Sequence, residues 1–259
     1  MPDLKLTLVQ TELVWEDIDA NLVHLTQCIT DIREETHLII LPEMFSTGFS
    51  MNAVELAESM DGKAVEWLQK TARGRKTAIA GSLMIREDKR FFNRFCWAAA
   101  DGTLTTCDKR HLFRMSGEEK IYSAGYDLIT VELMGWRLRP FVCYDLRFPV
   151  WTRNGANPYD VAIFVANWPA VRALHWQTLL RARAIENLCY VVGVNRVGRD
   201  GNGKQYSGDS AVYSPAGEEM FSLHNQAGAH TVTLNYPDLQ TYRAEFPAYK
   251  DADPFSIKH

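Results

Sequence analysis

A cysteine stands where a strand-like run of the sequence gives way to a turn. Residues 140–149 read PFVCYDLRFP, and the apolar Phe141 and Val142 lead directly into Cys143. A short apolar run with a β-branched residue predicts a strand, so we expect the thiol at the end of that strand. Backbone N–H groups at the start of a following helix favour the thiolate, the nucleophilic form of cysteine. The residues alone leave open the alternative that Cys143 is a small buried hydrophobic residue.

A glutamate and a lysine also follow predicted strands. Glu43 comes after HLIIL, residues 37–41, a run suited to a strand that is buried on both faces. Lys109 ends the second arm of a hairpin that is predicted at Asp101-Gly102. In α/β proteins, functional groups gather at the carboxyl ends of the strands. We therefore expect Glu43, Lys109 and Cys143 to meet in one cleft, although a solvated acid and a solubilising lysine are the ordinary alternatives at such positions.

The elements that must position these side chains alternate between strands and helices. Strands are predicted at 4–9, 37–41, 77–85, 91–100, 103–108, 141–143, 160–166, 190–197, 211–214, 219–222 and 230–235, and helices over 18–32, 61–72 and 174–189. Residues 110–127 form a predicted loop, and the tail from Tyr236 has no period, so we expect it to lie over a surface or a partner subunit. The pattern favours an α/β protein with helices on its sheets. No linker or repeat interrupts it, so residues 1–259 are expected to form a single domain.

Composition narrows the function classes. The chain has 259 residues, of which 46% are hydrophobic, and a formal net charge of −4, so it can bury a large core and gives no reason to expect a nucleic-acid partner. No segment approaches the length of a membrane span. The five cysteines are widely spaced, which is typical of a reducing compartment and predicts a cytoplasmic protein. The seven histidines form no cluster with cysteines, so we expect no metal and no other cofactor.

Three motifs together resemble one family, the nitrilase superfamily of carbon–nitrogen hydrolases. They are LPEMF around Glu43, DKRHLF around Lys109 and CYDLRFP from Cys143, in the family's order and with similar spacing; NWP at 167–169 and the helix RARAIEN also look like the family. The resemblance covers nearly the whole chain. It implies a four-layer αββα sandwich and a homodimer that extends the sandwich.

The resemblance also implies roles for the site residues. Glu43 would be the general base, Lys109 the oxyanion stabiliser and Cys143 the nucleophile that forms a thioester. Many members carry a second acid between the lysine and the cysteine. Glu119 matches that place best, although the adjacent Glu118 leaves the assignment open by one residue. A thiol is only slightly ionised at neutral pH, so a carboxylate that takes its proton suits this chemistry.

The cysteine motif looks most like the omega-amidase branch of the superfamily. That branch releases ammonia from short ω-amides of 2-oxo-dicarboxylates, such as 2-oxoglutaramate, and from succinamate. Arg147 is the candidate for the substrate carboxylate, because an arginine fork matches a carboxylate, but a structural ion-pair role is equally compatible with its position. The backbone N–H of Tyr144 would assist the oxyanion, and Trp168 and Phe45 would line the pocket.

Three other readings remain at this point. A thiol hydrolase can use a histidine as its base, and His111 is the candidate for that role. A nitrile hydrolase would share the same catalytic residues. A nitrilase-fold module that only binds a ligand would be expected to lack one of them, and none is missing here.

Overall fold

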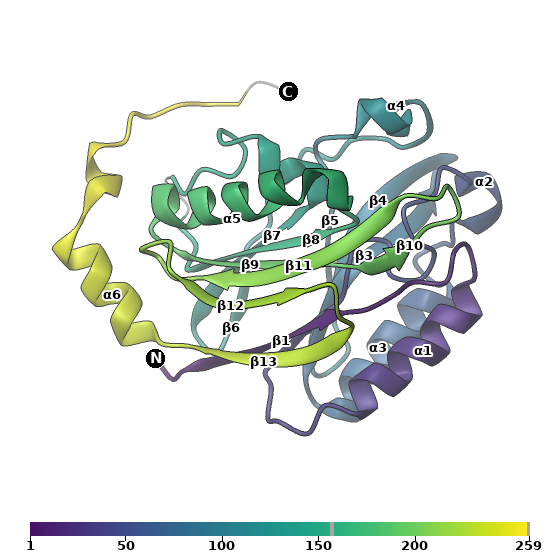
Figure 1. The fold of residues 1–259 in the computed structure, drawn as a ribbon, viewed down its shortest axis with the longest axis horizontal. Helices are drawn as coiled ribbons and strands as arrows, with labels where there is room; N and C mark the ends of the chain where they lie inside the picture. The colour runs from purple at the N-terminus through teal and green to yellow at the C-terminus, as the bar shows by residue number, and fades with distance from the viewer. Residues whose placement is uncertain (156–157, 258–259) are drawn as a thin grey trace.

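The computed structural model describes residues 1–155 and 158–257, which build two mixed β-sheets with helices on their outer faces (Figure 1). The strands are β1 (Leu4–Gln10), β2 (Leu38–Ile40), β3 (Ala78–Glu87), β4 (Arg90–Ala98), β5 (Leu104–Asp108), β6 (Val131–Leu133), β7 (Trp136–Val142), β8 (Val161–Ala166), β9 (Tyr190–Asn195), β10 (Val197–Arg199), β11 (Gln205–Tyr213), β12 (Glu219–His224) and β13 (Gly228–Leu234). The helices are α1 (Ile18–Thr30), α2 (Ala53–Leu56), α3 (Lys63–Arg75), α4 (Glu118–Ile121), α5 (Ala173–Asn187) and α6 (Tyr236–Glu245). Short 3-10 turns are η1 (Arg114–Ser116), η2 (Cys143–Arg147), η3 (Ala170–Arg172) and η4 (Ala248–Asp251).

The two sheets repeat one plan, in which a parallel centre is flanked by antiparallel strands. The first sheet has the order β13-β1-β2-β3-β4-β5, and β1, β2 and β3 are parallel. The second has the order β10-β11-β9-β8-β7-β6, with β12 paired to β11, and β7, β8 and β9 are parallel. Parallel neighbours end at the same edge of a sheet. The carboxyl ends of β2, β7 and β8 can therefore contribute residues to one site.

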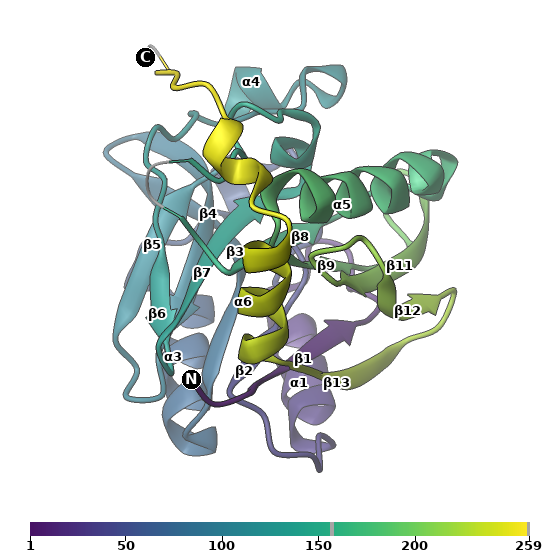
Figure 2. The same ribbon diagram turned by 90° about the vertical axis from the view of Figure 1, so that its left-hand side faces the viewer.

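Three apolar layers make up most of the core, and a smaller fourth cluster surrounds Met44 and Met84. Side chains from both sheets, among them Leu6, Ile40 and Ile163, form one buried cluster between them. A second cluster joins the first sheet to α1 and α3, and a third joins the second sheet to α5. Figures 1 and 2 show α1 and α3 on one outer face and α5 on the other. This arrangement confirms the predicted four-layer αββα sandwich.

Most of the predicted elements are present, and the longest helix that no pattern predicted lies in the C-terminal tail. Tyr236–Glu245, which show no period in the sequence, form α6 along one edge of the sandwich (Figure 2). Asn235 accepts a hydrogen bond from the Asp238 N–H as the N-cap, and a proline lies in the first turn. Leu239 is the buried residue of this helix. A helix with so little buried apolar surface has no periodic pattern to reveal it.

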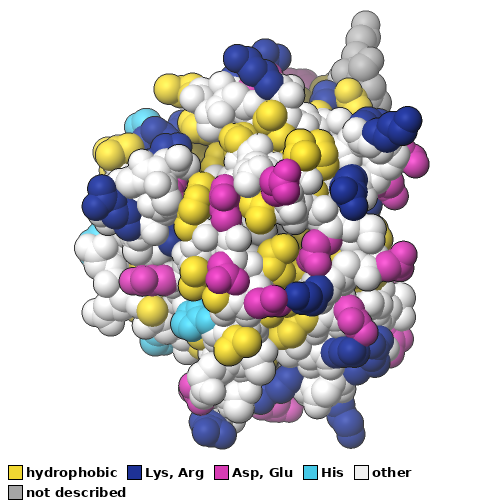
Figure 3. All heavy atoms as spheres, turned by 90° about the vertical axis from the view of Figure 1, so that its right-hand side faces the viewer, with side chains coloured by type: hydrophobic (Ala, Val, Ile, Leu, Met, Phe, Trp, Pro, Cys, Tyr) yellow, Lys and Arg dark blue, Asp and Glu magenta, His cyan; other side chains and the backbone are white. Residues whose placement is uncertain are grey.

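One face of the molecule, shown in Figure 3, carries both acidic and basic side chains. On the face shown in Figure 3, acidic side chains lie among hydrophobic ones, and basic side chains are dispersed towards the margins. Within residues 1–155 and 158–257, no helix is long and apolar enough to span a bilayer.

Candidate active site

Four strand ends bring polar side chains together between the sheets. They are Glu43 shortly after β2, Lys109 after β5, Cys143 after β7 and Asn167 after β8. Cys143 has a φ of 46°, in the left-handed region that side chains other than glycine rarely occupy. Strained residues of this kind persist where the surrounding structure holds them, often at functional sites. The chain therefore turns sharply at the cysteine and presents its thiol to the cleft.

Lys109 lies at the centre of a buried charged cluster. Its Nζ is 2.9 Å from Glu43 Oε1, and it is 2.9 and 3.0 Å from the two carboxylate oxygens of Glu118. The side chains of all three residues are fully buried. One ammonium thus faces two carboxyl groups away from water, where the loss of any one member leaves another without its partner.

The second acid is Glu118, which corrects the expectation that Glu119 fills this place. Gly117, with a φ of 77°, begins α4 so that Glu118 is directed inwards, where it also accepts the Phe113 N–H at 2.5 Å. Glu119 is only partly buried, and one of its carboxylate oxygens has no hydrogen-bond partner among the described residues. Two adjacent glutamates on one turn point in different directions. The position at which α4 begins therefore determines that Glu118, rather than Glu119, contacts Lys109.

Glu43 is held by donors on both of its oxygens. Oε1 accepts from Lys109 Nζ and from Asn93 Nδ2 at 2.8 Å, while Oε2 accepts from the Asn167 N–H at 2.8 Å. Donors on both oxygens fix the orientation of this carboxylate. Its charge also raises the pKa of the Cys143 thiol, so the two groups lie near each other. The carboxylate is therefore positioned beside the thiol and is suited to accept its proton.

Burial and the neighbouring charges decide the protonation of the cluster. Burial raises the pKa of the Cys143 thiol well above its ordinary range; the Glu43 carboxylate adds to this effect, and Lys109 opposes it. Burial alone would lower the pKa of Lys109, but the carboxylates of Glu118 and Glu43 outweigh it and raise that pKa. Burial also raises the pKa of Glu118, against the ammonium of Lys109. The free thiol is thus protonated near neutral pH, and the lysine is charged.

His111 lies in a different environment from the one a base for Cys143 would need. Its Nδ1 is 2.8 Å from Asp145 Oδ1, and its ring stacks on Phe148 at a centroid distance of 3.7 Å. Asp145 also accepts the N–H groups of His111 and Val142. The histidine therefore joins the segment after Lys109 to the turn that holds the cysteine.

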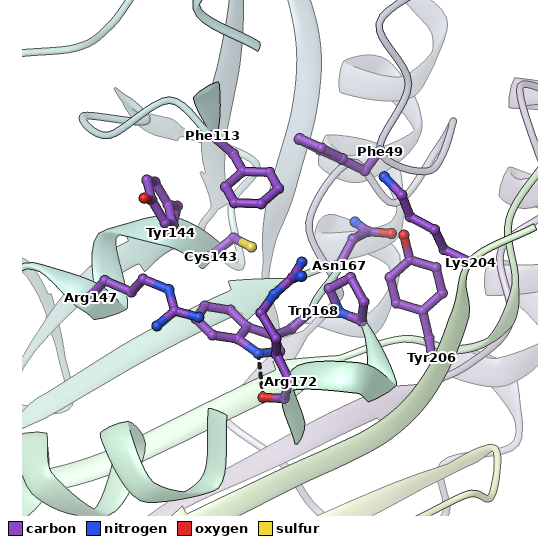
Figure 4. Close-up of a pocket in the computed structure, with 11 residues that line it drawn as sticks. Phe49, Phe113, Cys143, Tyr144, Arg147, Asn167, Trp168, Arg172, Lys204 and Tyr206 are labelled. Atoms are coloured by element: carbon purple, nitrogen blue, oxygen red, sulfur yellow. Dashed lines mark hydrogen bonds between the residues drawn. The ribbon is translucent and has the colours of Figure 1, made fainter. Parts of the chain in front are cut away.

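A pocket opens above Cys143 and contains three of the four predicted substrate-binding residues, Tyr144, Arg147 and Trp168 (Figure 4). The other lining residues are Phe49, Phe113, Asn167, Pro169, Arg172, Lys204 and Tyr206. The Arg147 guanidinium lies 4.7 Å from the centroid of the Trp168 ring and donates to His175 Nδ1 at 3.0 Å. Aromatic and cationic side chains therefore surround the thiol.

Phe45, the fourth predicted substrate-binding residue, lies in the hydrophobic core instead. The backbone turns at Met44, which has a φ of 44°, and the Phe45 N–H then donates to the Ser82 carbonyl. The ring is fully buried beside Gly81 and 5.8 Å from the centroid of Trp67. This corrects the prediction that Phe45 lines the pocket. The turn after β2 directs its side chain under β3 and away from the cysteine.

Several site residues were missed from the sequence. Asn93, Arg172, Lys204 and Tyr206 carry no local signal, because each reaches the site only through the packing of distant elements. Asn167 belongs to the NWP motif, which pointed to this position without a role. Within the described ranges, no group of three or more His, Cys, Asp or Glu side chains is placed to hold a metal ion.

Comparison with known proteins gives the class that this fold and site define. A family model described as carbon–nitrogen hydrolase matches residues 5–244. The chain belongs to this family, the nitrilase superfamily, as its motifs indicated. It is an amidase of the omega-amidase-like kind, as the relatives show.

The relatives match over almost the whole chain. The omega-amidase YafV of Escherichia coli strain K12 is 48% identical over 99% of this chain and 100% of its own length. The 2-oxoglutaramate amidase of Bacillus subtilis is 32% identical over 85% of this chain and 86% of its own. Among solved structures, XC1258 from Xanthomonas campestris, a CN-hydrolase superfamily protein with an arsenic adduct in its active site, is 45% identical with a TM-score of 0.97, and the match covers all of both chains.

Proposed function

We propose that this amidase releases ammonia from short ω-amides of 2-oxo-dicarboxylates, such as 2-oxoglutaramate, and from succinamate, through a thioester on Cys143. The observation that carries the proposal is the position of Cys143, which lines the cationic pocket and lies beside the Glu43 carboxylate that raises the pKa of its thiol. The relatives named omega-amidase and 2-oxoglutaramate amidase point to the same substrate class.

Glu43 is the general base of the proposed mechanism. It takes the proton of the Cys143 thiol as Sγ attacks the amide carbonyl carbon, which matters because the free thiol is protonated. It then gives a proton to the departing nitrogen as the C–N bond breaks and ammonia leaves. In the second half-reaction Glu43 activates a water molecule, which hydrolyses the thioester and frees the thiol. One carboxylate thus serves both halves.

Lys109 stabilises the oxyanion that forms on the substrate oxygen, and the Tyr144 N–H is the second donor. A donor of this kind is typically worth about 3 kcal/mol in the transition state. Glu118 holds the ammonium of Lys109 through both of its oxygens and so positions it. This assigns the second acid a supporting electrostatic role.

The charge of the pocket favours an acidic substrate. Arg147, Arg172 and Lys204 all line it, and among the described residues none of their three side chains forms an ion pair with a carboxylate. The Arg147 guanidinium lies 4.7 Å from the centroid of the Trp168 ring and uses one terminal nitrogen on His175, so its remaining N–H groups suit a carboxylate. A site built for a charged partner loses much of its affinity when that partner is absent. Arg147 is therefore the proposed main contact for the substrate carboxylate.

A comparison of acidic and neutral amides tests the proposal. The wild-type enzyme is expected to hydrolyse succinamate and 2-oxoglutaramate, with kcat/KM for butyramide about a hundredfold lower, or roughly 3 kcal/mol of lost transition-state binding. Arg147→Lys keeps the charge but loses the fork, so it should reduce kcat/KM for succinamate more than for butyramide. Ammonia release gives all of these rates. Equal kcat/KM for butyramide and succinamate on the wild-type enzyme would contradict carboxylate recognition and leave an amidase of another substrate.

The proposed functional unit is a homodimer, as the family resemblance implies. Large apolar side chains on η3 and α5 are exposed, namely Val171, Leu174 and Ile185. These residues supply apolar surface for contact with a second copy.

A further inference from the structure

Asn167 holds the proposed base through two of its polar groups and leaves the third unused. Its N–H donates to Glu43 Oε2 at 2.8 Å, and its Nδ2 donates to the Glu43 carbonyl at 2.5 Å. Because Nδ2 is committed to a carbonyl, the orientation of the amide is fixed and Oδ1 is the remaining acceptor. Oδ1 is buried and has no partner among the described residues.

An unpaired buried acceptor needs an explanation, because no hydrogen bond offsets the loss of its contact with water. Two other buried side-chain groups also lack partners, on Glu119 and Arg196, but neither residue lines the pocket of Cys143. Asn167 does line it, and only 4% of its surface is exposed. In Figure 4 its side chain appears between Cys143 on one side and Tyr206 and Lys204 on the other. The unpaired oxygen thus belongs to a residue that lines the same pocket as Cys143.

We propose that Asn167 Oδ1 accepts a hydrogen bond from the –NH2 group of the substrate and makes the site selective for primary amides. The inference rests on the proposed function, because it takes Cys143 as the nucleophile. Oδ1 can only accept, whereas Lys109 Nζ can only donate. The two groups therefore orient the carboxamide, with its oxygen towards Lys109 and its nitrogen towards Asn167.

This contact would strengthen as the reaction proceeds. The amide nitrogen receives a proton from Glu43 while the C–N bond breaks, so positive charge develops on its N–H groups. Hydrogen bonds from a charged donor are about twice as strong as those from a neutral one. An interaction that is stronger in the transition state than in the ground state raises the rate of the chemical step. The leaving oxygen of an ester has no N–H, so an ester gains nothing from Oδ1.

Succinamate and monomethyl succinate separate this role from the positioning of Glu43. They form the same thioester on Cys143 and differ only in the leaving group, and kcat/KM reports the step that forms the thioester. Asn167→Ala and Asn167→Leu should lower kcat/KM for the amide at least about tenfold more than for the ester, which corresponds to about 1.4 kcal/mol. Loss of the hold on Glu43 also weakens proton transfer to the departing nitrogen, so Asn93→Ala, which removes another donor to Glu43 and leaves Oδ1 in place, gives the change in the amide-to-ester ratio that positioning alone causes. The Asn167 variants should exceed that change, and a change no larger than that of Asn93→Ala would overturn the inference. Leucine keeps the volume of the side chain, so a folded variant is available if alanine leaves too large a cavity.

Three further variants complete the experiment. Asn167→Asp keeps an acceptor oxygen, so it should retain the amide-to-ester ratio even where both rates fall. Asn195→Ala is the matched control: Asn195 holds the backbone of Trp168 but does not line the pocket, so both substrates should change together. Cys143→Ala should lose both reactions. Equal losses of amide and ester activity in Asn167→Ala and Asn167→Leu would overturn this inference alone, whereas a Cys143→Ala variant that still turns over would overturn the proposed function with it.

Discussion

At the scale of single residues, the buried cluster of Lys109, Glu43 and Glu118 affects both the activity and the free energy of unfolding. Glu43 and Glu118 both contact the one ammonium, and all three side chains are inaccessible to water. Removing the shared partner of two buried carboxylates leaves both uncompensated, whereas neutralising one carboxylate leaves a complete ion pair. The three residues therefore differ in what their substitution does to the fold.

We predict a large loss of stability for Lys109→Met but not for Glu118→Gln. Lys109→Met should lower the free energy of unfolding by about 3–5 kcal/mol, as expected when one partner of a buried ion pair is lost. Glu118→Gln should keep the fold and lose activity, because Lys109 is then less firmly positioned. Urea unfolding and ammonia release measure the two quantities. A Glu118→Gln protein as unstable as Lys109→Met would contradict this view of the cluster.

The effect of Glu118→Gln on the free energy of unfolding should depend on pH. Burial raises the folded-state pKa of Glu118 despite the opposing Lys109 ammonium, so the folded protein binds this proton more tightly than the unfolded chain does. The stabilising contribution of Glu118 is then complete below the unfolded pKa, about 4.3, and is lost as the pH rises through the folded value. Glu118→Gln removes this loss. The stability of the variant relative to wild type should therefore rise with pH above that point, and a difference that is flat with pH would contradict the raised pKa.

At the scale of elements, one turn positions the nucleophile and another positions a cation of the pocket. In η2, Asp145 accepts the N–H groups of Val142 and His111, so one carboxylate joins the turn of Cys143 to the segment that follows Lys109. In the β10–β11 hairpin, Asp200 accepts the N–H groups of Asn202 and Lys204. The second turn brings a cation from far along the chain to the mouth of the pocket.

The Asp200 turn gives a prediction at this scale. Asp200 also accepts from the Tyr206 hydroxyl at 2.9 Å, so Asp200→Ala frees two pocket residues at once, Lys204 and Tyr206. KM for succinamate should rise about fivefold, as expected for the loss of roughly 1 kcal/mol of hydrogen bonding, while kcat/KM for butyramide changes by less than about twofold. Asn202→Ala is the control, because Asp200 binds the backbone of Asn202 rather than its side chain. A uniform loss for both substrates would indicate a purely structural role for the turn.

At the scale of the whole molecule, the two sheets share one buried core, which supports the prediction that residues 1–259 act as a single domain. The outer face over α5 carries the exposed apolar side chains of Val171, Leu174 and Ile185. Leu174 on α5 and Val23 on α1 are both 72% exposed and lie on opposite outer layers. This equal exposure makes the two residues a matched pair for testing the proposed homodimer.

Leu174→Asp should convert a dimer into a monomer, whereas Val23→Asp should leave the assembly unchanged. A carboxylate buried in an interface without a partner costs several kcal/mol, but the same change on a solvated face costs little. Size-exclusion chromatography with light scattering measures the mass of each protein. A monomeric wild type would contradict the homodimer, and a dimeric Leu174→Asp variant would place its interface elsewhere.

The parts of this protein that depend on local pattern could be predicted from its sequence. Apolar runs fixed where the main strands end, and the residue after each end, Glu43, Lys109 or Cys143, could be read directly. The convergence of the three on one cleft followed from a general rule for parallel strands. The family motifs then supplied the four-layer sandwich, because they extend over nearly the whole chain.

Which neighbouring side chains reach that cleft depends on how the chain packs in three dimensions, and could not be predicted from local pattern. A one-residue difference at the start of α4 places Glu118, rather than Glu119, on Lys109, and the turn at Met44 buries Phe45 in the core. Asn167 gained its role because the end of β8 in one sheet meets Glu43 from the other. The physical reason is the same in each case: a local pattern fixes the element, but the direction of a side chain beyond its end depends on backbone turns and contacts with residues far away in the sequence.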